Sequence, residues 1–136
     1  MEIKTNFFIV ILLSYNSLSC DGCSDALGFD SRLEVINNST KKIHFDGGFT
    51  YPDTSIGEIL SGEDIKPNSQ RVFGIQGRWE ERFEDLPAET LMIFIFDADT
   101  LDQVPWEKVR SEYKILRRYD LSLQDLKDRD WKVVYP

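Results

Sequence analysis

The sequence predicts a small, mainly β domain: an immunoglobulin-like β-sandwich that carries two or three short helices. Three observations predict this class. The chain has 136 residues, which is enough for one domain. Short apolar or alternating runs recur along it, separated by turns rich in Gly, Asn, Ser and Pro. Other segments place apolar residues at helical spacing. Because helix and strand alternate in the second half, an α+β fold with helices on one face of an antiparallel sheet is the alternative.

Six segments have the composition of β-strands. The strongest, residues 91–96, is apolar on both faces and is therefore expected at the centre of a sheet. The first two flank an Asn/Ser-rich turn and predict a β-hairpin, with Gly47 and Gly48 as the turn that ends its second strand. The expected strands are residues 32–36, 41–45, 71–75, 91–96, 115–121 and 131–135.

Three helices are expected. One covers residues 78–86 and ends before Pro87, a second begins at Pro105, and a third begins at Ser122, which with Asp125 matches a capping box. The two tryptophans on the helical stripes are expected in the core or in a lid rather than as platforms for sugars. The stripes consist of Trp79, Phe83 and Leu86 in the first helix and of Trp106, Val109, Tyr113 and Leu116 in the second.

The N-terminus has the layout of a secretory signal peptide, predicted over residues 1–19. A start with one lysine precedes seven uninterrupted apolar residues, 7–13, and a mostly small or polar stretch follows. The apolar core is too short to span a bilayer permanently. A buried N-terminal strand or helix is the alternative. Residues 20–31 are expected to form a tether before a single domain of residues 32–136.

Cys20 lies where a signal peptidase would cut, directly after Ser17-Leu18-Ser19. This resembles the lipobox of bacterial lipoproteins, with Ser17 and Leu18 in reversed order. The resemblance implies that Cys20 receives diacylglycerol and that membrane lipid holds the protein at the cell envelope, at the outer membrane. Cys23 is then a lone thiol in the tether. A Cys20–Cys23 disulfide is the alternative, whereas a redox pair lacks its βαβ context and a zinc site lacks ligands.

Most of the mature chain, residues 37–136, is similar to small uncharacterised lipoproteins of gut Bacteroidota. The similarity lies in a loop at residues 51–55, a segment at residues 119–126 and the terminus at residues 131–136. It implies an anchored location and a compact domain. No residue in it matches a catalytic signature, so the resemblance implies no activity.

Charge disfavours nucleic acid as a partner. The chain has 16 basic and 24 acidic residues and a net charge of −8, whereas nucleic-acid binders neutralise phosphates. One basic cluster, Arg110, Lys114, Arg117 and Arg118, is interleaved with acids and is expected to be a solvated face. The single histidine, His44, alternates with Ile43 and Phe45 and is expected to be exposed on a strand.

The best metal candidates are Asp97, Asp99 and Asp102, which follow the strongest strand. An EF-hand starting at Asp97 would need glycine and glutamate where Asp102 and Lys108 stand. These residues are therefore expected to solubilise a loop, with Asp102 capping the helix that begins at Pro105. No metal and no cofactor is expected, and nothing singles out a catalytic pair of carboxylates.

The sequence thus predicts a non-enzymatic envelope lipoprotein that binds an unknown protein or glycan partner through strand edges or through the irregular segment 49–64. An immunity-type inhibitor of a periplasmic toxin is the first alternative, because an acidic surface suits a basic target. A small enzyme with an unrecognised carboxylate site is the second.

Overall fold

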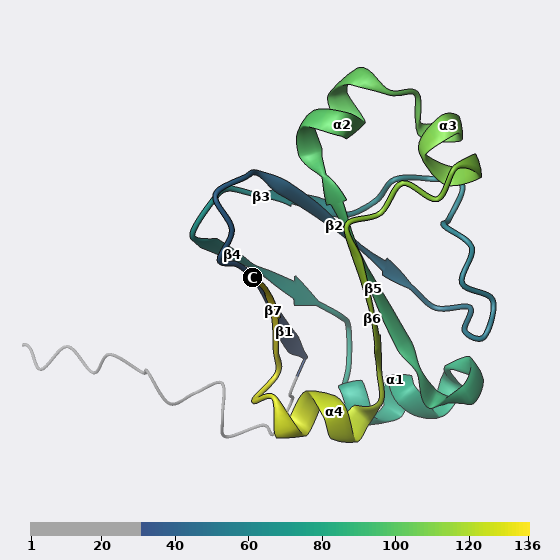
Figure 1. Cartoon of the computed structure of the whole chain (residues 1–136). Coiled ribbons are helices and arrows are strands. Elements are labelled where there is room, and N and C mark those ends of the chain that lie inside the picture. Colours follow the sequence, from purple (N-terminus) through teal and green to yellow (C-terminus); the bar gives the residue numbers. More distant parts are fainter. Residues whose placement is uncertain (1–30) are drawn as a thin grey trace, which may run out of the picture.

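Residues 31–136 are described by the structure, a computed structural model (Figure 1). Within them, seven strands, four α-helices and one 3₁₀-helix form a mixed but mostly β fold. The strands are β1 (Arg32–Asn37), β2 (Ile43–Gly48), β3 (Glu63–Ile65), β4 (Ser69–Gly74), β5 (Leu91–Asp97), β6 (Arg117–Leu121) and β7 (Lys132–Tyr135). The helices are α1 (Trp79–Asp85), η2 (Pro87–Glu89), α2 (Ala98–Gln103), α3 (Trp106–Ser111) and α4 (Leu123–Asp128).

The strands form two sheets. Sheet A has the order β4-β1-β7, and sheet B has the order β3-β2-β5-β6. Every pairing is antiparallel except that of β1 with β7, which is parallel. The last strand is therefore paired in a sheet, as its sequence predicts, and the first and last strands lie side by side.

Strand β5 is the buried centre of sheet B, which confirms its prediction from the sequence. Leu91, Ile93 and Ile95 face the main core, which also receives side chains from sheet A. Met92 and Phe94, with Phe96, face a second core on the opposite side of the sheet. A strand that is apolar on both faces needs a cover on both sides. The second cover comes from α3 and from the segment between β2 and β3, which contributes Ile56.

The helices lie at two opposite ends of the sheets. Helices α1 and α4 lie together at one end, and α2 and α3 lie at the other (Figure 1). Trp79 of α1 is completely buried in the main core. Trp106 of α3 packs on the second core, and its indole N–H donates to the carbonyl of Glu58 at 2.9 Å. The expected core position is confirmed for Trp79, and Trp106 is partly buried against the second core.

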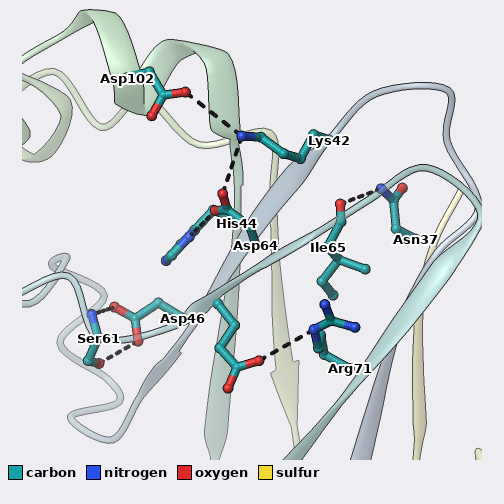
Figure 2. Close-up of polar contacts among 10 residues, drawn as sticks. Asn37, Lys42, His44, Asp46, Ser61, Asp64, Ile65, Arg71 and Asp102 are labelled. Atoms are coloured by element: carbon teal, nitrogen blue, oxygen red, sulfur yellow. Dashed lines mark hydrogen bonds and ion pairs between the residues drawn. The ribbon is translucent and has the colours of Figure 1, made fainter.

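The predicted hairpin between the first two strands is wrong, because β1 and β2 belong to different sheets. The cause is Asn37, which is completely buried at the end of β1. Its side-chain amide donates to the carbonyls of Lys41 at 2.7 Å and Ile65 at 3.1 Å, and its oxygen accepts from Ser39. The Asn/Ser-rich turn is thus a crossover between the sheets, and the bond from Asn37 of sheet A to Ile65 of sheet B connects them (Figure 2).

The helical predictions are confirmed for α1 and α4 and need correction elsewhere. Ser122 and Asp125 form the predicted capping box of α4. Helix α3 ends at Ser111, and Tyr113 has a positive φ of 51°, so the apolar stripe breaks there and Leu116 is 46% exposed. Helix α2 was not expected. Across residues 31–136, none of the helices has the length and hydrophobicity that a bilayer crossing requires.

Candidate functional site

A groove of about 380 Å³ lies where the edge of sheet A separates from the edge of sheet B. One wall is β4, and the other is formed by β2 and by the residues that lead into β3. We call it the inter-sheet groove. Its volume is within the usual range for ligand sites. It combines apolar side chains with three glycines and with the polar residues Asp46, Ser61 and Glu63.

Apolar side chains form the floor of the inter-sheet groove. Phe45 on β2 and Phe73 on β4 meet edge to face, with ring centroids 6.0 Å apart. Ile75 and Phe49 extend this floor along the groove. The guanidinium of Arg82, from α1, lies 5.1 Å from the centre of the Phe49 ring, a cation–π distance. The floor of the groove is therefore apolar and largely aromatic.

Glycines keep the groove open. A Cβ atom on Gly62 would overlap the backbone carbonyl of Phe45, so only glycine lets this segment lie against β2. A Cβ atom on Gly47 would lie 3.2 Å from the ring of Phe73. Gly47 and Gly48 are the last two residues of β2 rather than the predicted turn. Glycine inside a strand often marks a place where another backbone or side chain approaches closely. Gly47 is therefore the signal in the sequence that could have indicated this groove.

The carboxylate of Asp46 fastens the second wall to β2. It accepts hydrogen bonds from the hydroxyl of Ser61 at 2.9 Å and from the backbone N–H of Ser61 at 3.3 Å (Figure 2). It also accepts from the backbone N–H of Gly47 at 2.8 Å. Asp46 is 8% exposed, so these bonds satisfy a buried charge. They anchor the end of the irregular segment beside the groove.

An ion pair marks one end of the groove. The guanidinium of Arg71 on β4 lies 3.6 Å from the carboxylate of Glu63 on β3 (Figure 2). Both side chains are about half exposed, so the pair contributes little to stability. Glu63 is the first residue of β3, so the chain opposite Val72 and Gly74 is not yet a strand. Among residues 31–136, no strand pairs with β4 on that side.

The backbone of β4 has a free edge at the groove. In an antiparallel pair, alternate residues direct their N–H and C=O groups to the partner strand. The N–H of Ile75 donates to the carbonyl of Ser31 at 3.1 Å, which places Ile75 and Phe73 among the residues that face β1. Val72 and Gly74 therefore direct their N–H and C=O groups away from β1. Within residues 31–136, no backbone hydrogen bond joins these groups to the opposite wall.

The prediction that His44 is exposed is wrong, because His44 is only 7% exposed. The alternation along β2 is as expected, but the face that carries His44 is covered by the second core. Its Nδ1 lies 2.7 Å from a carboxylate oxygen of Asp64 on β3 (Figure 2). Its Nε2 is buried and has no hydrogen-bond partner among the described residues.

Asp64 also pairs with Lys42, whose Nζ lies 3.3 Å from Asp64 and 3.8 Å from Asp102. The hydrogen bond from His44 is the main cause that lowers the pKa of Asp64, with a further contribution from Lys42. The pKa of Lys42 is raised, mainly by its hydrogen bond to Asp64. These groups form a charged network that connects β2, β3 and α2.

The three aspartates considered as metal ligands have other contacts. The prediction that Asp102 caps the helix beginning at Pro105 is wrong, because the N-cap of α3 is Pro105 and has no side-chain cap bond. Asp97 instead caps α2: its side chain accepts from the N–H of Thr100 at 3.0 Å. Asp102 lies within α2 and faces Lys42. The structure shows no group of three or more potential metal ligands in residues 31–136.

The basic cluster is paired with the acids that interrupt it. Arg118 contacts the carboxylate of Asp120 at 2.8 Å and 3.0 Å, and Lys114 lies 2.7 Å from Glu112. Arg110 donates to the carbonyl of Ile56 at 3.2 Å, which holds the irregular segment against α3.

A second groove, of about 540 Å³, lies between α1, η2 and α4. Glu80, Glu84 and Glu89 line it, opposed by Lys127, whose Nζ lies 3.8 Å from Glu80. This groove has a charged rim, whereas the inter-sheet groove offers unpaired backbone groups beside an apolar floor.

The predicted signal peptide, Cys20, Cys23 and the tether up to residue 30 lie outside the described residues. Compared with protein-family models, curated proteins and solved structures, the chain matches none of them.

Proposed function

We propose that this chain is an exported protein, held at the outer membrane of a bacterial envelope by lipid on Cys20, and that its domain binds a partner without catalysing a reaction. The anchoring half of the proposal rests on the apolar run 7–13 and the lipobox-like residues before Cys20. The binding half rests on one observation, the inter-sheet groove, where an apolar floor lies beside the free edge of β4.

The finer fold assignment belongs to the same proposal. We infer that sheets A and B form a small β-sandwich of immunoglobulin-like character. The main core supports this, because it takes Leu33 and Val133 from sheet A and Ile93 from sheet B. The hydroxyl of Tyr119 on β6 also donates to the carbonyl of Val134 on β7 at 2.8 Å, which connects the two sheets on the side away from the groove.

The position of the groove suits an anchored protein. The chain enters the domain at Ser31, whose carbonyl is bonded to Ile75, a residue of the groove floor. A tether over residues 20–31 spans at most about 40 Å. The groove would then stay close to the membrane surface. Each buried methylene of the acyl chains contributes about 0.8 kcal/mol to anchoring, so more than one chain is needed for a stable attachment.

Intact-mass analysis of the full chain, expressed in a bacterial host, tests the anchor. We expect the wild type to lose residues 1–19, to gain the mass of a lipid, and to fractionate with membranes. Cys23→Ser is the matched control and should behave as the wild type. Cys20→Ser should lack the lipid mass. If Cys20→Ser and wild type have the same modification and the same fractionation, Cys20 is not the lipid attachment point.

A further inference from the structure

We propose that the partner is an extended polypeptide segment, which adds as a strand to the free edge of β4 and places apolar side chains in the inter-sheet groove. This inference rests on the proposed binding function and names the chemistry of its partner. The sheet would then have the order partner-β4-β1-β7.

The outward-facing backbone groups of β4 match those of an extended polypeptide. Val72 and Gly74 direct their N–H and C=O groups away from β1, at the spacing of alternate residues along a strand. An extended polypeptide backbone presents donors and acceptors at the same spacing. Strand addition of this kind derives affinity from main-chain hydrogen bonds and specificity from side-chain pockets.

The edge of β4 is unprotected at Val72 and Gly74. Edge strands commonly have a feature that prevents pairing, such as a proline or a covering loop. Arg71 and Glu63 close the part of β4 nearest to β3, but their ion pair leaves Val72 and Gly74 beyond it. Gly74 contributes no side chain, and a Cβ atom there would meet only the carbonyl of Ser31, at 3.7 Å. Gly74 therefore adds no side chain beside the edge, and no strand of residues 31–136 pairs with it there.

The floor of the groove gives the side-chain preference. Phe45, Phe73 and Ile75 line it below the β4 edge, so alternate side chains of a docked strand would meet apolar atoms. The side chains between them would face outward, beside Glu63, which is 61% exposed and paired with Arg71 only at 3.6 Å. The chain as a whole has a net charge of −8. We therefore expect the bound segment to alternate apolar residues with polar residues that include lysine or arginine.

The test uses the purified full chain and a phage-displayed library of random twelve-residue peptides, with selected peptides then synthesised. Val72→Pro is the informative variant. Its N–H faces away from β1, so proline there removes a donor to the partner without removing a bond of the native sheet. Val72→Thr keeps the N–H and is the matched control, and Glu84→Gln controls for binding in the second groove.

We expect selection of peptides with alternating apolar and basic residues. Their affinity should be at least tenfold lower for Val72→Pro than for Val72→Thr, which keeps the N–H, and should be unchanged for Glu84→Gln. The amides of Val72 and Gly74 should become protected from hydrogen exchange when peptide binds. A second measurement uses only the wild-type protein and therefore does not depend on the folding of a variant. Two N-methylated forms of each peptide are compared, one methylated at the odd-numbered amides and one at the even-numbered amides. Only the form whose methylated amides face β4 should lose binding.

Three results would overturn the inference. The first is a library that yields no binder. The second is a set of peptides that bind Val72→Pro, with its fold verified by circular dichroism, as tightly as the wild type. The third is self-association of the wild type that Val72→Pro abolishes, because the occupant would then be a second copy of this chain. The second result would leave a binding function in place at another surface, and none of the three bears on lipid attachment at Cys20.

Discussion

Replacing Asp46 should destabilise the domain and loosen the wall of the inter-sheet groove. Two bonds from Ser61 connect the irregular segment to the Asp46 carboxylate, at 2.9 Å from the hydroxyl and 3.3 Å from the backbone N–H. A hydrogen bond to a charged group contributes about 1.5–3 kcal/mol, and the longer bond contributes less. We therefore expect Asp46→Ala to lower the free energy of unfolding by about 3 kcal/mol and Ser61→Ala to lower it by about 1.5 kcal/mol.

The double variant separates these bonds from other effects of the substitutions. If Asp46 and Ser61 act through each other, Asp46→Ala with Ser61→Ala should cost little more than Asp46→Ala alone, which gives a coupling energy of about 1.5 kcal/mol. Urea unfolding at pH 7, followed by tryptophan fluorescence, measures all four proteins. A cost below about 0.5 kcal/mol for Asp46→Ala, or strict additivity of the two single variants, would refute the reasoning.

Three further predictions concern stability. Trp79 is completely buried and its indole N–H has no partner among the described residues, so Trp79→Phe should change the unfolding free energy by less than about 1 kcal/mol, whereas Trp79→Ala should cost about 3–5 kcal/mol in the same urea assay. Removing the helix cap with Ser122→Ala should cost about 1 kcal/mol, measured as a lower midpoint of thermal unfolding; an unchanged midpoint would contradict the role of the capping box. The pKa of Asp64 is lower in the folded than in the unfolded protein, so its ionised form stabilises the fold. This contribution to the free energy of unfolding is present above the unfolded-state pKa and is lost as pH falls through the folded-state pKa. Asp64 is half exposed, so Asp64→Asn should cost less than about 1 kcal/mol at pH 7, and the difference from the wild type should shrink below pH 3.8; a difference that grows on acidification would contradict this.

Elements whose pattern is local were predictable from the sequence. Strand β5 is apolar at every position from 91 to 96, so no assignment other than a buried strand fits its length. The capping box at Ser122 likewise depends only on residues three apart. Trp79 was expected in the core because its helical stripe needs an apolar partner surface.

Features that depend on distant partners were not predictable. The hairpin between β1 and β2 failed because Asn37 bonds to the carbonyl of Ile65, 28 residues away, and turns the chain into the other sheet. The burial of His44 depends on Ile56 and α3, which cover its face, and on Asp64 of the short strand β3. Strand alternation alone cannot show that a polar face is covered.

Strand edges and the segment 49–64 were expected as contact surfaces, but their meeting in one groove could not be predicted, for a similar reason. Its walls come from β2, β4 and the segment before β3, and none of these segments has a motif. Gly47 offered the nearest signal, because glycine within a strand often marks a close contact, yet beside Gly48 it also fits a turn.

The parallel pairing of β1 with β7 has a consequence for the order in which the chain can fold. Glu34 pairs with Lys132, so the first strand cannot complete its sheet until residue 132 has been synthesised, 98 residues later. Contacts between residues so far apart in sequence form slowly, because a long loop must close before they can stabilise anything. In the export that we propose for this chain, an unfolded polypeptide would cross the membrane. The late closure of sheet A would then keep the chain open for transport and let folding finish on the far side.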